Sequence, residues 1–358
     1  MMENYNDKFY MKIALEEALK GVGRVSPNPL VGAVIVRDGE ILGKGFHKKY
    51  GESHAEVNAI NNAVKNGHST KGATMYVTLE PCSHYGKTPP CVDALVEASI
   101  SRVVIASKDI NPMVDGAMFL RAHDIFVTEG VLKDEADKIN EIFFHYMKTK
   151  MPYIAMKFGM TLDGKIATKT GDSKYISGLS ALHNVHVARN KYSAIMVGVN
   201  TILADDPKLT CRIEGGRDPI RIIMDSHLKT PINSKVVKEG TIIVTQNKNT
   251  KEFEKLGVKI INANTRNIKE VLEKISELKI DSILLEGGAT LNYSFIESGF
   301  VNKVSTYISP KIFGGKEAFT PISGEGISKI TEAFMLKNLT VAKLGEDILI
   351  EGYLCSQE

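Results

Sequence analysis

The sequence has no tryptophan, only four cysteines and no long hydrophobic stretch. Its longest apolar runs, such as LVGAVIV at residues 30–36, are far too short to cross a bilayer. The first twenty residues carry charge throughout and lack the apolar core of a signal peptide. We therefore expect a cytoplasmic protein with no membrane partner. In that reducing compartment, two cysteines close in sequence favour a metal or reactive site over a disulfide.

The chain also has little excess charge, with 45 Lys and Arg against 42 Asp and Glu and a net charge of +3. The basic residues are scattered rather than gathered into a block, which argues against a nucleic-acid partner. No G-x-G-x-x-G fingerprint is present, so an ordinary dinucleotide-binding Rossmann domain is not expected. With 43% hydrophobic and 24% charged residues, the composition is typical of a globular protein, and 358 residues are enough for two domains.

Helix and strand patterns alternate along the chain, and the alternation runs twice. In the first part, apolar spacing predicts helices over residues 7–20, 54–66, 91–100 and 132–150, with strands between them. Pro152 follows the last of these helices, and the alternation then restarts. The pattern predicts an α/β fold with two domains, residues 1–150 and 151–358, and a hairpin at the C-terminal end.

Three residue types in the first part suit a zinc ion. His54, Cys82 and Cys91 provide the three protein ligands of a catalytic zinc, whose fourth place is left for water. Cys91 begins a predicted helix, a position that lowers the pKa of a thiol. Glu56 is placed to take a proton from a zinc-held water, whose pKa the metal lowers to about 7. The H-x-E and P-C elements match zinc nucleobase deaminases, so we expect one Zn²⁺ per chain with Glu56 as the catalytic general acid and base.

Other interpretations of the same residues stay open. Ser53 and Glu56 also fit a capping box, the cysteines also fit buried small side chains, and His84 is a competing ligand. A nucleic-acid base deaminase with an appended domain would need a basic groove and an aromatic platform. A zinc-stabilised binding module would favour four ligands. The near-neutral charge, the missing tryptophan and the insertion before Cys91 disfavour the first, and Glu56 with only three clear ligands disfavours the second.

Eight residues separate Cys82 from Cys91, where the common deaminase pattern has two. The stretch PCSHYGKTPPC, with PNPLVGAVIV and GFHKKYGESHAEVNAI before it, resembles the deaminase half of the bifunctional riboflavin-biosynthesis deaminase/reductases, the RibD family. The resemblance implies a cytidine-deaminase-like α/β sandwich over residues 1–150. It implies hydrolytic deamination of 2,5-diamino-6-ribosylamino-4(3H)-pyrimidinone 5′-phosphate. The implied substrate contacts are Asn28, His47 and Lys87.

The second part resembles the reductase half of the same family in MKFGMTLDGKIAT, GDSKYIS, VGVNTILADDPKLTCR and LLEGGATL. The resemblance implies a dihydrofolate-reductase-like α/β domain over residues 151–358 that uses NADPH to reduce the ribosyl group to ribityl. The implied substrate contacts are Ser173, Arg189, Leu209, Arg212 and Glu286. The implied NADPH contacts are Gly159, Tyr175, Thr201, Asp205, Ser226, Gly288, Ala289, Thr290, Leu291, Asn292, Tyr293 and Ser294. Lys157, at a predicted strand end, is a further candidate for a role in reduction.

These residues also have simpler interpretations. The glycine-rich turn before Ala289 fits a phosphate held at a helix N-terminus, but a plain strand–helix turn needs small residues too. Arg189 also fits a solvated helix charge, and the segment 205–207 also fits an ordinary turn. Small-molecule substrates are the expected partners, and the sequence leaves a homo-oligomer open.

Overall fold

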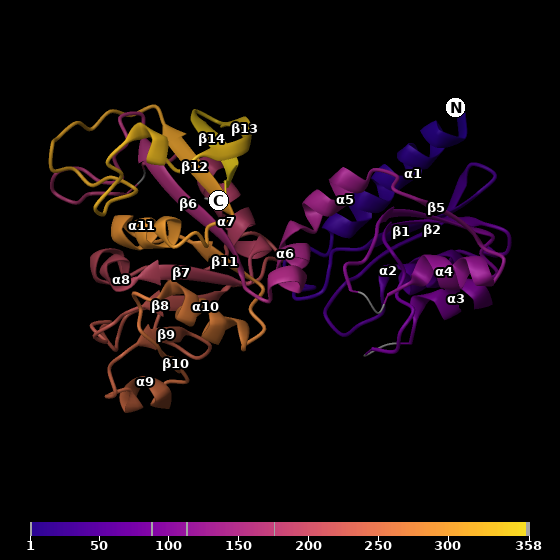
Figure 1. The fold of residues 1–358 in the computed structure, drawn as a ribbon, viewed down its shortest axis with the longest axis horizontal. Coiled ribbons are helices and arrows are strands. Elements are labelled where there is room, and N and C mark those ends of the chain that lie inside the picture. The colour runs from indigo at the N-terminus through magenta and orange to yellow at the C-terminus, as the bar shows by residue number, and fades with distance from the viewer. Residues whose placement is uncertain (1, 87–88, 112–113, 175, 356–358) are drawn as a thin grey trace. The chain divides into compact units, whose positions relative to one another are not determined.

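The computed structural model describes residues 2–86, 89–111, 114–174 and 176–355, with only the backbone of residues 2–5. The chain divides into two compact units, Met1–Lys150 and Met151–Glu358, each built from alternating helices and strands (Figure 1). The predicted α/β fold class with two domains is confirmed. Among the described residues, no helix is both long enough and apolar enough to span a membrane.

The first unit is built on a five-stranded sheet with the order β2-β1-β3-β4-β5. Strand β1 is antiparallel to β2 and β3, while β3, β4 and β5 run parallel. The strands are β1 (Gly32–Arg37), β2 (Glu40–Phe46), β3 (Thr74–Leu79), β4 (Arg102–Ser107) and β5 (Phe126–Glu129). The helices are α1 (Met2–Leu19), α2 (Ala55–Lys65), α3 (Cys91–Glu97), α4 (Gly116–Ala122), α5 (Lys133–Ile139) and α6 (Glu141–Thr149).

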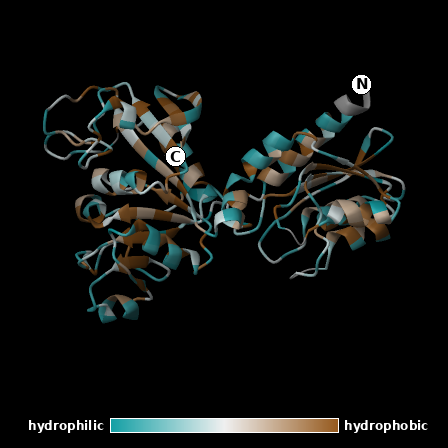
Figure 2. Cartoon of the chain, viewed as in Figure 1, coloured by the Kyte–Doolittle hydropathy of each residue, from teal (hydrophilic) through white to brown (hydrophobic). Residues whose placement is uncertain are grey.

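Helices cover both faces of this sheet, because alternate strand residues are apolar on each side. On one face, Met11 and Ala14 of α1 and Ala136 of α5 pack against Val34 and Val104. On the other face, α2, α3 and α4 pack against the alternate strand residues, as Figure 1 also shows. The result is a three-layer sandwich whose hydrophobic residues concentrate on the strands and inner helix faces (Figure 2).

The second unit has a nine-stranded sheet with the order β10-β9-β8-β7-β11-β6-β12-β14-β13. The strands from β10 to β12 in this order run parallel, and the C-terminal hairpin adds β14 and β13 antiparallel. The strands are β6 (Tyr153–Thr161), β7 (Ala194–Gly198), β8 (Ile220–Met224), β9 (Ile242–Thr245), β10 (Lys259–Asn262), β11 (Ser282–Leu285), β12 (Lys303–Ser309), β13 (Leu336–Leu344) and β14 (Asp347–Leu354).

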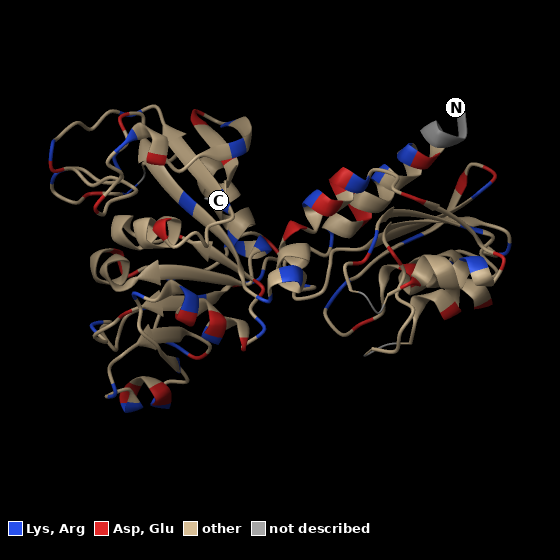
Figure 3. Ribbon diagram, viewed as in Figure 1, with Lys and Arg blue, Asp and Glu red and all other residues tan. Residues whose placement is uncertain are grey.

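The helices of the second unit also lie on both faces of their sheet. Phe295 of α11 and Leu272 of α10 pack with Met156 and Ile283 on one face. Ile202 of α8 and Phe253 of α9 pack on the other face, as does α7 through Val185. The helices are α7 (Leu179–Lys191), α8 (Val199–Asp205), α9 (Lys251–Lys255), α10 (Ile268–Ser276) and α11 (Ala289–Glu297), with a 3₁₀ turn at Ile330–Glu332. Acidic and basic residues are interspersed along the helices of both units (Figure 3).

The expected helix over residues 132–150 is wrong in one respect, because two helices occupy this range. Helix α5 ends and α6 begins around Asn140, whose side chain is buried. Its Oδ1 accepts from the backbone N–H of Leu30 over 2.8 Å, and its Nδ2 donates to the Leu30 carbonyl over 2.9 Å. The amide side chain thus pairs with an extended segment 110 residues away, and the helix breaks where it does so.

Candidate functional site

The first candidate site lies where α2 and α3 meet the end of β3. His54 immediately precedes α2, Cys91 begins α3, and Cys82 follows β3. One ligand atom from each of these residues lies within 4.8 Å of the others. His54 Nδ1 is 3.2 Å from Cys91 Sγ and 3.5 Å from Cys82 Sγ. We call these three residues the His–Cys cluster. Its donors, one imidazole nitrogen and two sulfurs, suit a zinc ion.

Glu56 lies beside the cluster in the first turn of α2, and only 3% of it is exposed. Its Oε2 is buried without a hydrogen-bond partner among the described residues. Burial raises the pKa of this carboxyl, and the charge of His54 opposes the rise. An unpartnered carboxylate oxygen in a buried site calls for a missing partner, and a water held on a metal would supply it. The residues present therefore fit a bound zinc.

The capping-box interpretation of Glu56 is wrong. The N-cap of α2 is His54 rather than Ser53, and no side chain makes a capping hydrogen bond there. The backbone carbonyl of Ser53 instead accepts a hydrogen bond from His47 Nδ1 over 3.2 Å. The side chain of Glu56 points into a buried site instead of closing the helix end.

Hydrogen bonds link the two thiols and affect their pKa values in opposite directions. Hydrogen bonding from Cys91 lowers the pKa of Cys82, and the Cys91 backbone N–H also donates to Cys82 Sγ over 3.3 Å. The same contact, with burial, raises the pKa of Cys91. The hydrogen bond of the Cys82 sulfur also raises the pKa of His54.

A cavity of about 360 Å³ opens beside the His–Cys cluster. Asn28 and His47, two residues expected to contact substrate, line this cavity. They also contact each other, with Asn28 Nδ2 3.0 Å from His47 Nε2. The Ser53 carbonyl can only accept, so His47 carries its proton on Nδ1 and its Nε2 accepts from Asn28. Burial lowers the pKa of His47 and favours this neutral form. The third expected contact, Lys87, lies outside the described residues.

His84, considered above as a competing ligand, lines the cavity. Other lining residues were not found from the sequence: Asp109 and Asn111, and Phe143, Tyr146 and Met147 of α6. Asp109 and Asn111 follow β4 directly, and polar residues after a parallel strand are a recognisable signal for a ligand site. His84 Nδ1 is buried without a hydrogen-bond partner among the described residues, a feature that only the structure reveals.

The second candidate site gathers three predicted residues of the second unit. Glu286 directly follows β11, Arg189 lies in α7, and Lys157 lies within β6 rather than at its expected strand end. Arg189 of α7 makes a bidentate ion pair with Glu286, with Nε–Oε1 at 2.8 Å and Nη2–Oε2 at 2.9 Å. Lys157 Nζ on β6 lies 3.8 Å from Glu286 Oε2. We call these residues the Arg–Glu–Lys cluster. Only 14% of the Arg189 side chain is exposed, so its interpretation as a solvated helix charge is wrong.

Electrostatics in this cluster favour the charged form of the carboxylate. Burial would raise the pKa of Glu286, but Arg189 and Lys157 outweigh it and lower the pKa to about 2. Burial lowers the pKa of Lys157, and Glu286 opposes that change. The Lys157 ammonium also lies 5.5 Å from the ring centre of Tyr307, whose hydroxyl donates to Asn184 Oδ1 over 2.6 Å. Lys157 is therefore held between an anion and an aromatic face.

The expected cofactor segment forms the N-terminus of α11. Its N-cap is Gly288, and no side chain makes a capping hydrogen bond there. A Cβ added to Gly288 would lie 3.8 Å from Thr201 Oγ1 of α8, so these two expected contacts are neighbours. Asn292 Oδ1 is buried without a hydrogen-bond partner among the described residues. Uncapped backbone N–H groups next to glycines fit the phosphates of a dinucleotide.

The remaining predicted residues are more dispersed. Gly159 lies on β6, Ser226 contacts Thr265 after β8, and Asp205 is exposed at the end of α8. Ser173 is half-buried, Leu209 is buried with a positive φ of 51°, and Arg212 is exposed. Burial lowers the pKa of His186, and the charges of Arg189 and Arg212 lower it further. Tyr175 lies outside the described residues.

Comparisons with known proteins cover the whole chain. The family model of the RibD C-terminal domain matches residues 152–350, and that of the cytidine and deoxycytidylate deaminase zinc-binding region matches residues 4–107. The riboflavin biosynthesis protein RibD of Actinobacillus pleuropneumoniae is 48% identical over 98% of this chain and 96% of its own length. Its counterpart from Aquifex aeolicus is 43% identical over 96% of this chain and 97% of its own.

A solved structure has the same arrangement of elements. It is a diaminohydroxyphosphoribosylaminopyrimidine deaminase/5-amino-6-(5-phosphoribosylamino)uracil reductase from Thermotoga maritima. It superposes with a TM-score of 0.90 and 39% identity, and the match covers 99% of this chain and all of that one. Both candidate sites described above therefore lie within regions shared with characterised folds.

Proposed function

Because the chain belongs to the RibD family of bifunctional riboflavin-biosynthesis enzymes, we propose that its two units divide the deaminase and reductase reactions between them. Residues 1–150 carry out the hydrolytic deamination of 2,5-diamino-6-ribosylamino-4(3H)-pyrimidinone 5′-phosphate. Residues 151–358 then reduce the ribosyl group of the product to ribityl with NADPH. The His–Cys cluster lies in the first unit and the Arg–Glu–Lys cluster in the second, which supports this division.

In the deaminase site, we assign His54, Cys82 and Cys91 as the zinc ligands and Glu56 as the general acid and base. Zinc, when bound, supplies a water of lowered pKa. Glu56 takes one proton from the attacking water and delivers it to the ring nitrogen. It then takes the remaining proton from the hydroxyl added to the ring carbon and delivers it to the departing amine, so one water enters and one ammonia leaves. The burial of Glu56 suits this role, because a raised carboxyl pKa lies closer to the working pH.

The Asn28–His47 pair is assigned to substrate binding. The neutral imidazole is fixed by the Ser53 carbonyl, and it in turn orients the Asn28 amide toward the cavity. An amide offers both a donor and an acceptor to the edge of a pyrimidinone ring. Lys87 is assigned to the substrate phosphate by resemblance alone.

In the reductase site, the uncapped N-terminus of α11 and its neighbour Thr201 are assigned to NADPH. NADPH, when bound, supplies the hydride for reduction. Arg189 donates two hydrogen bonds to Glu286 and one to the Thr210 carbonyl. Two of its five N–H donors therefore remain for substrate. Arg212, which is exposed, is the stronger candidate for the substrate phosphate.

The observation that carries this proposal is the unpartnered carboxylate oxygen of Glu56 beside three closely spaced metal-ligand atoms. The test is ammonia release by the full-length chain from the pyrimidinone, from cytidine and from transfer RNA. We expect release from the pyrimidinone alone. Release from cytidine or transfer RNA would replace the substrate assignment, and release from none of the three would reject deamination.

We also assign the enzyme to the cytoplasm, a reducing compartment that keeps metal-binding cysteines as thiols. All four cysteines are free in the structure, in agreement with this assignment.

A further inference from the structure

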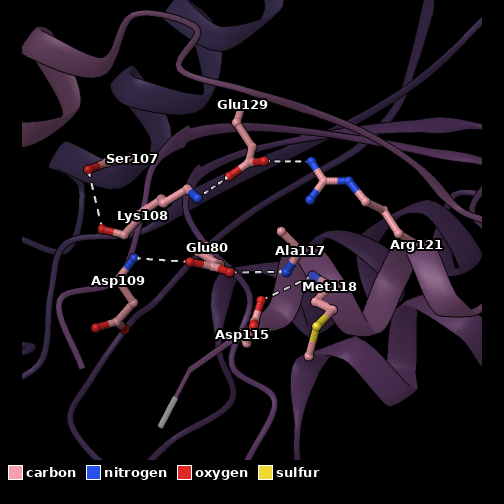
Figure 4. Close-up of polar contacts among 9 residues, drawn as sticks. All are labelled: Glu80, Ser107, Lys108, Asp109, Asp115, Ala117, Met118, Arg121 and Glu129. Carbon is pink, nitrogen blue, oxygen red and sulfur yellow. Dashed lines mark hydrogen bonds and ion pairs between the residues drawn. The ribbon is translucent and has the colours of Figure 1, made fainter. Parts of the chain in front are cut away.

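Glu80 lies directly before Pro81 and the metal-ligand candidate Cys82. It is 7% exposed, and its backbone N–H donates to the Ser107 carbonyl at the end of β4 over 2.9 Å. Its two carboxylate oxygens each accept a backbone N–H, one from the connection that follows β4 and one from the first turn of α4. Glu80 Oε2 accepts from Asp109 over 3.3 Å, and Glu80 Oε1 accepts from Ala117 over 3.0 Å (Figure 4).

Other contacts bring the same two parts of the chain together. The Ser83 hydroxyl oxygen accepts the backbone N–H of Asp115 over 3.0 Å. A Cβ added to Gly116 would lie only 2.1 Å from the Pro81 carbonyl oxygen, so the two backbones are in direct contact. The residues on both sides of Cys82 are therefore fastened to the start of α4.

The connection held by Glu80 forms part of the substrate cavity. Asp109 and Asn111 line that cavity together with Cys82 and Glu56. The Asp109 carboxylate accepts the Asn111 backbone N–H over 2.8 Å, so the position of one residue sets the position of the other. Figure 4 shows the Asp109 side chain turned away from Glu80, while its backbone N–H points to the Glu80 carboxylate.

We propose that Glu80 is a positioning residue of the deaminase site, which holds Asp109 and Asn111 at the cavity wall in fixed register with Cys82. This inference rests on the proposed deaminase function. Glu80 acts through the backbone amides that it binds. It is not among the three residues that gather around the metal position, and although it is one of the residues that line the cavity, both of its carboxylate oxygens are occupied by backbone N–H groups. Its loss should therefore disturb substrate binding more than metal binding or proton transfer.

The test is Glu80→Gln in the full-length enzyme. A Gln side chain keeps one acceptor oxygen but presents an NH₂ group to the other backbone N–H, so one of the two contacts becomes repulsive. We expect the KM for the pyrimidinone to rise about tenfold, the scale of a lost hydrogen bond to a charged acceptor. We expect kcat to change by less than about threefold and zinc to stay at one per chain, because the ligands and Glu56 keep their places.

Glu129→Gln is the matched control. Glu129 is drawn in the same view, but it pairs with the side chains of Lys108 and Arg121 and is not among the residues that line the cavity (Figure 4). We expect its KM to match that of the wild type. Reduction of the deaminated intermediate by the same Glu80→Gln preparation should be normal, which verifies the amount of folded enzyme.

The outcomes separate the possible explanations. An unchanged KM in Glu80→Gln overturns the positioning role, as does an equal rise in Glu129→Gln or a parallel loss of zinc and kcat. If Glu80→Gln does not fold, Ser83→Ala tests the proposal instead. This variant removes the Ser83 hydroxyl that accepts the Asp115 backbone N–H and so loosens the same link between the Cys82 turn and the start of α4. A rise in its KM at full zinc content supports the proposal, and an unchanged KM overturns it. A wild-type enzyme that releases no ammonia rejects the proposed function instead.

Discussion

The Arg189–Glu286 ion pair allows us to predict how much stability the second unit loses when Glu286 is replaced. Glu286 is 12% exposed, and its neighbours lower its carboxyl pKa from 4.5 to about 2. At about 1.4 kcal/mol for each pKa unit, the charged carboxylate stabilises the folded state by about 3 kcal/mol at neutral pH. Glu286→Gln removes this contribution and leaves the Arg189 guanidinium without its counter-charge. We therefore expect the second unit to lose about 3 kcal/mol of stability, within the range for a broken buried pair.

The pH dependence gives this prediction a sign. The pKa of Glu286 is lower in the folded state, so its contribution is fully present above pH 4.5 and is lost as the pH falls toward 2. The stability difference between the wild type and Glu286→Gln should be constant from pH 5 to pH 8, on the order of 3 kcal/mol, and should shrink below pH 4.5.

Urea unfolding followed by hydrogen exchange and mass spectrometry measures this difference, because peptides from β11 report on the second unit alone. Glu273→Gln is the control, since Glu273 is 53% exposed and its only ion pair with Lys269 among the described residues spans 4.0 Å. We expect a change below about 0.5 kcal/mol for that variant. A loss of less than about 1 kcal/mol for Glu286→Gln at pH 7, or a difference that grows as the pH falls, would refute the reasoning.

Three further predictions concern the metal, the division of the chain and the reductase site. Cys82→Ser and Cys91→Ser should each lose most of their zinc by elemental analysis, because each removes one of three ligands, and full occupancy in both would reject the ligand assignment. A fragment of residues 151–358 should fold, bind NADPH and oxidise it only with the deaminated intermediate and without added zinc, and failure to bind NADPH would contradict the proposed division. Lys157→Ala in the full-length chain should slow NADPH oxidation at least about tenfold while ammonia release stays normal, and equal loss of both activities would count against a reductase role.

The sequence predicts the fold class well, because strand and helix periods are long and regular in both units. The break at Asn140 was not predicted, since it depends on a pairing with Leu30 that local periodicity does not contain. Helices α4, α8 and α9 also escaped notice. Each has only five to seven residues, too few to show a helical repeat.

The candidate sites show the same limit. The expectation that His54, Cys82 and Cys91 share one ion came from their residue types, the count of three ligands and the H-x-E and P-C elements, all of which are visible in the sequence. The backbone N–H of Cys91 that donates to Cys82 Sγ could not be predicted, since it depends on how the loop between them folds back. The pairing of Arg189 with Glu286 was also out of reach, because these residues are 97 positions apart and both were assigned to substrate.

The most direct test of the two-activity account is to follow ammonia and NADPH together in Glu56→Gln. This variant should keep its zinc, because Glu56 is not one of the three clustered ligand atoms. With the pyrimidinone as substrate, we expect ammonia release to fall at least about a hundredfold, the usual scale for a lost general acid and base. With the deaminated intermediate, NADPH oxidation should proceed at the wild-type rate. Near-normal ammonia release by this variant would contradict the account.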